Sequence, residues 1–390
     1  MKFNRFAAVL AAALPLMSMA AASSAPQYVI TDLGVVSGYI ASQSWGVSSS
    51  GNYAVGRSLF VSQDVPGASW PTSIYSTGTG ALSGMPALSG HPYDWGYAIN
   101  NSGVAVGLSA TDTTGAGALP TMWSNGTATA LKLPTGQTVG RAFGINNNGI
   151  AVGSVGSDTG EVGVVYNTVS GKSTIIQALS DDGSYMQRAF GISDNGMIVG
   201  AGVNNGRNDA VVYNMNNGTM VTLATPAANV NIGSIAFGIS SNGQYVVGAT
   251  GNDSFIWSAT TGVVVAQMPA ISSSGSLKSV NDSGWAVGNT GGAYANPILV
   301  AGGTTYLVND LITNGAGWNF TSTTSASAMG IANNGAIVGT AQLNGLEHMY
   351  MATLVSAVPE PATYGLMGAG LLAVGVASRR RRNDNNKAKD

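Results

Sequence analysis

Apolar and polar residues along the body of the chain are arranged in a pattern that recurs seven times. Each copy has a small residue, Ile or Val, Asn or Ser, two turn residues and Gly, then an apolar run ending in Val-Gly. The copies are GVSSSGNYAVG from Gly46, AINNSGVAVG from Ala98, GINNNGIAVG from Gly144, GISDNGMIVG from Gly191, GISSNGQYVVG from Gly238, SVNDSGWAVG from Ser279 and GIANNGAIVG from Gly330. Their Ile or Val positions are on average about 47 residues apart, and a period of about 40 to 50 residues is typical of propeller blades or two-helix repeats.

Local composition favours strands over helices. Asn-Gly and Ser-Gly turns flanked by β-branched residues indicate hairpins, and a helical period of 3.6 residues is absent. A second apolar run follows in each copy, and in most copies a Gly-containing turn and a further apolar run come after it. These second runs are Ile74-Tyr75, Met122-Trp123, Val165-Tyr166, Val212-Tyr213, Ile256-Trp257, Ile298-Leu299 and Met349-Tyr350. Four strands in each of seven units predict an all-β, seven-bladed β-propeller over residues 23–355. A parallel solenoid is the alternative.

The phase of the repeat predicts how the ring closes. The last unit stops after its third strand, near residues 350–355, whereas an unassigned strand, Tyr28–Gly34, precedes the first unit. We expect this N-terminal strand to complete the seventh blade, because pairing would remove two exposed sheet edges.

The repeated residues are interpreted as packing positions and not as a ligand code. The motif Ile or Val is expected to be buried in a blade core. Asn-Gly pairs such as Asn148-Gly149, Asn195-Gly196 and Asn334-Gly335 are expected to supply the positive φ of a tight turn. The final Gly, as in Gly153, Gly200 and Gly288, is expected to let neighbouring backbones approach closely.

The N-terminal segment, residues 1–22, has the features of a secretory signal peptide. Lys2 and Arg5 precede an apolar stretch, and Ala20-Ala21-Ala22 offers small residues to a signal peptidase. A buried N-terminal helix is the alternative, which Pro15 and the Ala-rich flank disfavour.

The C-terminal segment, residues 356–390, combines three features. Val358-Pro359-Glu360-Pro361 precedes an apolar stretch of 16 residues, and Arg379, Arg380, Arg381 and Arg382 follow. As a helix the apolar stretch would be about 24 Å long, somewhat short of the roughly 20 residues that span a bilayer comfortably. A transmembrane helix is predicted, with the arginines holding its end in the cytoplasm.

This tripartite tail closely resembles the PEP-CTERM sorting signal of Gram-negative bacteria. The resemblance implies recognition by an exosortase, a membrane protease that would cut near Pro359, Glu360 and Pro361. It also implies export across the inner membrane, transient anchoring, and release to the cell surface or extracellular matrix, where such proteins are often associated with exopolysaccharide and biofilm. An ordinary C-terminal anchor with an incidental Pro-Glu-Pro is the alternative.

The body itself resembles the extracellular repeats of the HAF type, through Gly-Ile-Asn-x-x-Gly-x-x-Val-Gly. It departs from them where His-Ala-Phe would stand, since those sites read Asp209-Ala210-Val211, Ser254-Phe255-Ile256 and His348-Met349-Tyr350. The family offers no catalytic residues to transfer.

Composition narrows the chemistry available to the body. Only 8% of the 390 residues are charged and 55 are Gly, which argues against a helical bundle. The chain has no Cys, which excludes disulfides and thiolate chemistry. Between Ser23 and Ala357 there are seven basic and 14 acidic residues, which gives a net charge of about −7. Nucleic-acid binding is therefore not expected.

Candidate catalytic and metal-binding groups are few. The body has two glutamates, Glu161 and Glu347, where a glycosidase would need two neighbouring carboxylates. Further candidates are interpreted as loop, turn or strand residues: His91, His348, Asp181-Asp182, Asn208-Asp209, Asn252-Asp253 and Asn281-Asp282. Trp45, Trp95 and Tyr97 are interpreted as core aromatics, with a sugar-stacking surface as the alternative.

The sequence therefore predicts a non-enzymatic, surface-sorted structural or matrix protein, with no cofactor or metal. Its expected partners are signal peptidase, exosortase and an exopolysaccharide. A polysaccharide- or ligand-binding propeller is the alternative, and an extracellular polysaccharide hydrolase or lyase is the third hypothesis.

Overall fold

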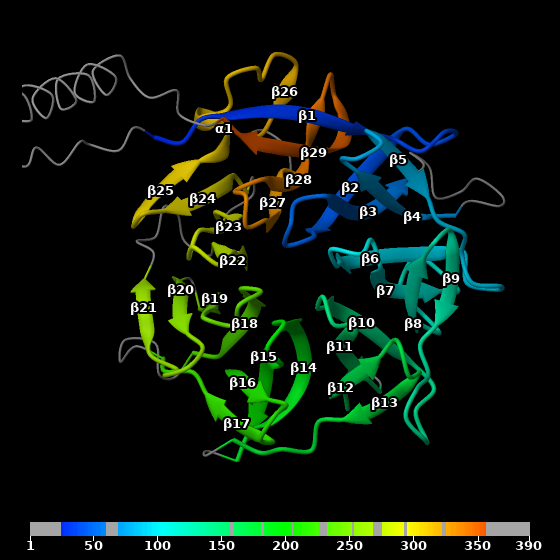
Figure 1. Cartoon of the computed structure of the whole chain (residues 1–390), viewed down its shortest axis with the longest axis vertical. Helices are drawn as coiled ribbons and strands as arrows, with labels where there is room; N and C mark the ends of the chain where they lie inside the picture. The colour runs from blue at the N-terminus through cyan, green and yellow to red at the C-terminus, as the bar shows by residue number, and fades with distance from the viewer. Residues whose placement is uncertain are drawn as a thin grey trace, which may run out of the picture.

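The computed structural model describes residues 25–355, except 60–68, 157–159, 181–182, 205, 226–231, 252, 268–274, 292–294 and 322–324. The predicted signal peptide and the predicted sorting segment, Val358 to Arg382 included, lie outside the described residues. The described part forms seven antiparallel sheets around a central axis (Figure 1), with a single helical turn, α1 (Val308–Leu311). The prediction of an all-β, seven-bladed propeller is confirmed. No helix within these described ranges is long and apolar enough to span a bilayer.

Each of the first six blades is a four-stranded meander whose first strand lies nearest the axis. Blade 1 contains β2 (Ala41–Val47), β3 (Tyr53–Leu59), β4 (Thr72–Ser76) and β5 (Ala81–Gly84). Blade 2 contains β6 (Tyr93–Ile99), β7 (Ala105–Ala110), β8 (Leu119–Ser124) and β9 (Thr127–Ala130). Blade 3 contains β10 (Gly140–Ile145), β11 (Ile150–Val155), β12 (Val162–Asn167) and β13 (Lys172–Ile175). Blade 4 contains β14 (Tyr185–Ile192), β15 (Met197–Asn204), β16 (Arg207–Asn214) and β17 (Thr219–Thr222). Blade 5 contains β18 (Ser234–Ile239), β19 (Tyr245–Thr250), β20 (Asp253–Ser258) and β21 (Val264–Gln267). Blade 6 contains β22 (Ser276–Val280), β23 (Ala286–Asn289), β24 (Pro297–Ala301) and β25 (Thr304–Leu307).

Blade 7 combines strands from both ends of the described chain. β27 (Ser327–Ile331), β28 (Ile337–Leu343) and β29 (Leu346–Leu354) form its inner part, and β26 (Trp318–Asn319) pairs with the far end of β28. β1 (Tyr28–Gly34) pairs antiparallel with β29, from Tyr28 opposite Leu354 to Gly34 opposite Met349. Figure 1 shows β1 along the outer edge of this blade. The inner strands β27 and β2 are in contact, so the seven sheets form a ring and not an open stack.

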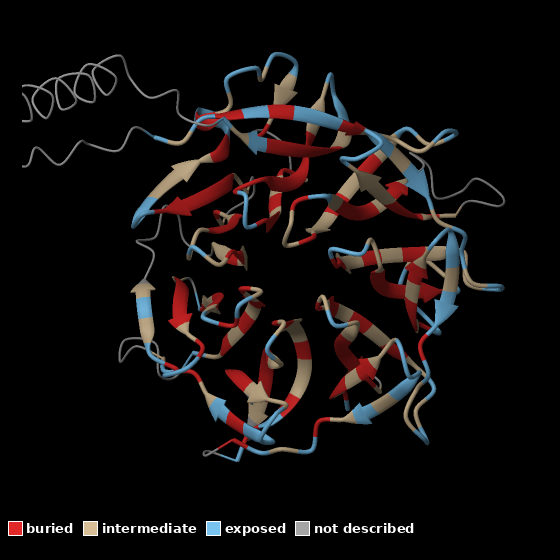
Figure 2. Ribbon diagram, viewed as in Figure 1, coloured by how far each residue is buried: buried red, intermediate tan, exposed pale blue. Residues whose placement is uncertain are grey.

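The hydrophobic core lies between neighbouring blades and is carried by their middle strands. All six residues of β7 are buried, whereas the outermost strand of the same blade, β9, is mostly exposed. Figure 2 shows this gradient from buried middle strands to exposed outer strands around the ring. One inter-blade cluster packs Val199 and Leu223 of blade 4 against Phe255 and Trp257 of blade 5. Neighbouring sheets therefore bury each other's apolar faces, as in any stacked-sheet architecture.

The glycine that ends each Val-Gly run permits a close backbone approach. A Cβ atom built on Gly200 would lie 1.9 Å from the carbonyl oxygen of Arg188 on the inner strand. The same conflict, at 1.7–2.1 Å, occurs at the equivalent glycine of every blade: Gly56, Gly107, Gly153, Gly200, Gly248, Gly288 and Gly339. The close approach that was predicted for Gly153, Gly200 and Gly288 is confirmed, because only a residue without Cβ fits there.

The turn after each inner strand contains a glycine in the left-handed region of backbone conformation. Positive φ occurs at the turn glycine, for example 73° at Gly149 and 85° at Gly196. The preceding asparagines, Asn148 and Asn195, are not among the non-glycine residues with positive φ. The expectation that the Asn-Gly pairs supply the positive φ of the turn is therefore confirmed, with the glycine as the residue that adopts it. The glycine supplies the conformation, and the asparagine side chain is available for hydrogen bonds to the next blade.

Candidate functional site: the axial cavity

A β-bulge in each inner strand creates the candidate site. In blade 4 the inner strand has one register shift near its start, between Met186 and Arg188. In all seven blades the register between the inner strand and its neighbour also shifts at the residue directly before the repeat copy, which has no partner on the second strand. Bulges of this kind redirect a side chain, and here all seven of these side chains line one cavity on the axis. We call these residues the axial collar: Trp45, Tyr97, Phe143, Phe190, Phe237, Lys278 and Met329.

Five aromatic members of the axial collar form a continuous arc. Ring centroids are 5.5 Å apart for Trp45 and Tyr97, and 5.4 Å apart for Tyr97 and Phe143. The next two steps, Phe143 to Phe190 and Phe190 to Phe237, measure 5.3 and 5.8 Å. The rings are tilted or edge-on, which is the arrangement that aromatic quadrupoles favour. The arc thus presents a contiguous apolar surface to the axis.

Lys278 follows the arc and is the one cation of the axial collar. Its Nζ lies 3.8 Å from the ring centroid of Phe237, within the range of a cation–π contact. Burial lowers the pKa of Lys278. No carboxylate among the described residues forms an ion pair with its ammonium group. A half-buried positive charge therefore faces the cavity without a protein anion to balance it.

Polar turn residues lie at one end of the cavity, and five of them line it: Ser49, Asn147, Asp194, Ser241 and Asn333. We call one residue per blade, two positions after the motif Ile or Val, the turn ring: Ser49, Asn101, Asn147, Asp194, Ser241, Asp282 and Asn333. Seven hydrogen bonds of 2.8–3.0 Å, each from a backbone N–H of one blade's turn to an oxygen of the next, link the seven turns in a closed circle. Asn147 also donates across the ring to Ser49, and Asn333 donates to Ser241. These cross-ring bonds narrow this end of the channel.

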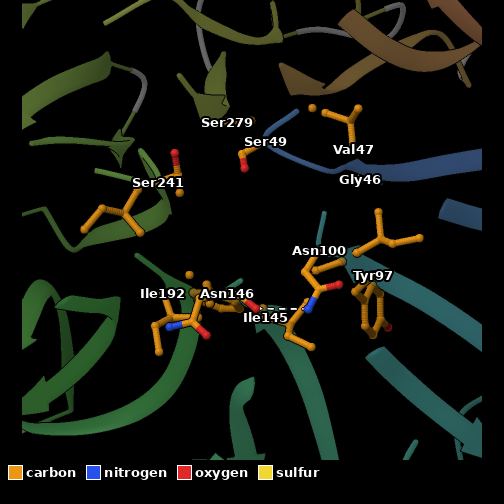
Figure 3. Close-up of a pocket in the computed structure, with 18 of the residues that line it drawn as sticks. Gly46, Val47, Ser49, Tyr97, Asn100, Ile145, Asn146, Ile192, Ser241 and Ser279 are labelled. Carbon is orange, nitrogen blue, oxygen red and sulfur yellow. Dashed lines mark hydrogen bonds between the residues drawn. The ribbon is translucent and has the colours of Figure 1, made fainter. Parts of the chain in front are cut away.

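A deeper layer of side chains joins the blades beneath the turn ring. The Asn100 amide donates to the Asn146 carbonyl, and the Asn146 amide donates to the Ser193 carbonyl, at 3.2 and 3.0 Å. Figure 3 shows Asn100 and Asn146 beside the cavity with Tyr97, Ile145 and Ser241. Hence the repeated asparagines hold neighbouring blades together, which supports their interpretation as structural residues.

Two arginines, Arg141 and Arg188, lie on the side of the axial collar away from the turn ring. Arg141 and Arg188 stand two residues before the collar residues Phe143 and Phe190, and a strand advances about 3.3 Å per residue. Both guanidinium groups contact Glu161, whose side chain is fully buried. Burial raises the pKa of Tyr97, and the charges of Arg141 and Arg57 partly offset that effect. Arginines therefore approach the collar from the side away from the turn ring.

The guanidinium group of Arg57 lies close to three tryptophan rings. Its guanidinium carbon is 4.6 Å from the ring of Trp70, 5.1 Å from that of Trp95 and 6.0 Å from that of Trp45. Burial lowers the pKa of Arg57 to about 10, although the charge of Glu347 favours its protonation. Arg57 also donates to Gln43, which in turn donates to Glu347.

Trp45, Trp95 and Tyr97, which the sequence analysis considered together, lie in two different places in the structure. Trp45 and Tyr97 belong to the axial collar, whereas Trp95 packs against Arg57 and Trp70. The sequence analysis missed Phe143, Phe190, Phe237, Lys278 and Met329. One signal could have found them, because each stands directly before the first residue of a repeat copy and so shares the repeat spacing.

The acidic and histidine candidates are engaged in separate local contacts. Glu161 contacts two arginines in blades 3 and 4, and Glu347 accepts from Gln43 near blade 7, so the two glutamates have different partners. His348 Nδ1 lies 2.9 Å from Asp32 on β1, and His91 Nδ1 lies 3.1 Å from the Ser89 carbonyl oxygen. Asp209 pairs with Arg207, Asp282 belongs to the turn ring, and Asp181-Asp182 and Asn252 lie outside the described residues. Across the described ranges, no group of three His, Cys, Asp or Glu residues could hold a metal ion.

Asp94 on β6 predicts a pH dependence of stability. It is fully buried, neither carboxyl oxygen accepts a well-formed hydrogen bond, and burial raises its pKa to about 7. The folded state therefore binds the Asp94 proton more tightly than the unfolded state does. As a result, the free energy of unfolding should fall as pH rises from about 4 through 7, by at most about 4 kcal/mol. We expect Asp94→Asn to raise the melting temperature at pH 8 relative to the parent protein, and to do so less at pH 5. Melts of the exposed control Asp310→Asn should follow the parent at both pH values, and an equal response of the two variants would contradict the assignment.

Comparison with known proteins adds one decisive match. Residues 357–382 match the family described as the PEP-CTERM protein-sorting motif. The chain carries this motif. It implies processing by an exosortase and points to an exported, cell-surface protein of Gram-negative bacteria. The match covers the tail only, so the HAF-type resemblance of the body stays a prediction.

Two solved structures are among those that resemble this chain in fold. The WD40 β-propeller domain of Doa1 has 9% sequence identity and a TM-score of 0.48, over 82% of this chain and 96% of that chain. TolB from Acinetobacter baumannii has 11% identity and a TM-score of 0.41, over 77% of this chain and 80% of that chain. No curated protein matches the sequence.

Proposed function

We propose that the chain is a non-enzymatic structural component of the cell surface or extracellular matrix, delivered there by its C-terminal motif. The observation that carries the proposal is the sorting motif at residues 357–382 behind a body made of one repeated unit. PEP-CTERM proteins are often associated with exopolysaccharide, and a matrix role is what that resemblance implies.

The use of the repeated polar residues supports a structural role. The turn ring and the asparagine layer are hydrogen-bonded between blades, and the buried Glu161 is held by two arginines. Catalytic acids and bases need a free group poised beside a substrate position. A screen of the exported protein on polysaccharides and esters separates this proposal from the hydrolase or lyase hypothesis, since turnover of any substrate would overturn it.

A second candidate function, ligand or polysaccharide binding, is favoured by the axial collar. Binding pockets are typically lined by aromatic and apolar side chains with a few polar groups that fix orientation. The arc from Trp45 to Phe237, with Lys278 at its end, has this composition. A structural propeller has no need of an unpaired cation on its axis.

Processing of the tail gives the sharpest test of surface sorting. We expect the extracellular form to end close to Pro359–Pro361 and to lack Arg379–Arg382, as measured by mass spectrometry of its C-terminus. Glu360→Ala should accumulate in the membrane fraction with the arginines retained, because the recognition motif is altered.

The control for this test is Asp384→Ala, which changes a tail residue beyond the arginine cluster and should be processed like the parent. Loss of the exosortase should reproduce the Glu360→Ala pattern in the parent protein. Extracellular protein that still carries Arg379–Arg382 would contradict the proposed processing. Retention at the surface is a separate point, and equal recovery of the protein in the soluble culture fraction and the matrix fraction would contradict it.

A further inference from the structure

We propose that the axial cavity binds one acidic sugar ring, a uronate residue, with its carboxylate on Lys278 and its apolar face against the axial collar. The inference rests on the proposed surface role only for the source of the ligand, an acidic polysaccharide. The site itself is argued from the collar, the turn ring and the charges along the axis.

The unpaired ammonium group of Lys278 requires an anion. Partly buried charges lose hydration, and proteins usually compensate them with a partner of opposite sign. Lys278 Nζ lies 3.8 Å from the ring centroid of Phe237, and no carboxylate among the described residues pairs with it. A ligand carboxylate would form the missing charge-assisted hydrogen bond.

The aromatic arc determines what the rest of the ligand must be. Four consecutive ring pairs, each with centroids less than 6 Å apart, surround the axis from Trp45 to Phe237. A pyranose presents C–H groups on its faces and hydroxyls at its rim, so its faces suit aromatic walls and its rim suits polar groups. A simple inorganic anion would leave these apolar walls unused.

The size of the cavity limits the ligand to about one sugar ring. Its volume is about 210 Å³, whereas pockets for drug-sized ligands are about 300–1,000 Å³. A longer polysaccharide could therefore place only a terminal residue inside, with the remaining chain outside the channel.

Charges along the axis orient this residue. Asp194 and Asp282 lie in the turn ring, and their carboxylates already accept hydrogen bonds from Asn147 and Asn333. Asp194 lines the cavity, and its remaining lone pairs can accept from sugar hydroxyls. Both carboxylates would repel a second carboxylate. The ligand carboxylate is thus directed away from the turn ring, toward Lys278. Because cross-ring hydrogen bonds narrow the turn-ring end, the ligand enters from the side of Arg141 and Arg188.

Titration calorimetry of the exported protein tests the proposal with three probes: glucuronate, glucose and acetate. Glucuronate is expected to bind at least tenfold more tightly than glucose, which lacks the charge, and than acetate, which lacks the ring. Lys278→Met places in blade 6 the residue that blade 7 has at Met329, so the variant should fold, and it should weaken glucuronate binding at least tenfold. Lys278→Arg should retain most of the affinity.

Lys132→Met is the matched control, because it removes the same charge from an exposed position outside the channel. It should bind glucuronate like the parent. Phe190→Leu should weaken glucuronate and glucose alike, since it removes stacking and not charge. The proposal is overturned if glucuronate gives no binding, if it binds no better than acetate, or if Lys278→Met binds it as the parent does. None of these outcomes affects the mass of the processed C-terminus, so a failure here is distinguishable from a failure of the sorting proposal.

Discussion

Gly200→Ala is expected to lower the free energy of unfolding by about 3 kcal/mol or more, because the new methyl group has no space. Its Cβ would lie 1.9 Å from the carbonyl oxygen of Arg188, which belongs to the backbone of the neighbouring strand β14. A side chain could rotate away, but this carbonyl can move only if β14 separates from β15. That separation would also displace Phe190 of the axial collar, since its bulge depends on the same pairing.

Thermal melts of the purified protein measure this effect. At roughly 2 °C per kcal/mol for a domain of this size, the melting temperature should fall by at least about 6 °C. The matched control is Gly78→Ala in an exposed turn of blade 1, where the nearest atom to the new Cβ, Ser76 Oγ, is 3.6 Å away. This control should stay within about 0.5 kcal/mol of the parent. Equal melting temperatures for the two variants would show that β14 and β15 do not approach as closely as described.

The ring of blades could be predicted from the sequence because its signals are local. A turn glycine such as Gly149 and the glycine that ends the Val-Gly run, such as Gly153, mark each hairpin within ten residues. Both glycines are required by short-range geometry, positive φ in one case and a carbonyl contact in the other. Counting such hairpins was therefore enough to give the number of blades.

The candidate site could not be predicted in the same way, because it is formed by residues that contact each other only after the ring closes. Phe143 and Phe190 are 47 positions apart, and their shared place before a repeat copy marks them as equivalent positions without indicating that their rings are in contact. Their orientation depends on a bulge, which breaks the alternation of inward and outward side chains that sequence patterns detect. The residue type also varies around the axial collar, from Trp45 to Lys278 and Met329. A search for one recurring residue type would therefore not find this position.

The same limit applies to the repeated asparagines. The sequence indicated that Asn146 stands at the start of a turn, but its amide donates to Ser193 in the next blade. Asn147 likewise bonds Asp194 through both backbone and side chain. One copy of the repeat is enough to place such an asparagine in a turn. Its hydrogen-bond partner belongs to the next blade, so the partner can be identified only from the three-dimensional structure.

Deletion of residues 28–34, which form β1, is expected to lower the melting temperature by on the order of 10 °C. Tyr28, Ile30 and Leu33 are buried, at 0%, 5% and 4% exposure, and burial of each large apolar side chain contributes about 1.5–3 kcal/mol. The deletion would also expose the edge of β29 and leave the amide of Asn314 without Ile30, with which it exchanges two hydrogen bonds.

Loss of β1 affects closure and not only one strand, because it joins the beginning of the described chain to its end. The hydrogen bonds of Asn314 and of Thr313 to this strand span more than 280 positions of sequence. A variant that begins at Gln27 keeps all of β1 and is the control for shortening the N-terminus, so it should melt like the parent. If the variant without residues 28–34 also melts like the parent, the remaining strands of blade 7 close the ring by themselves. A large loss, by contrast, would mean that the seven blades form a stable ring only when both ends of the chain pair in one sheet.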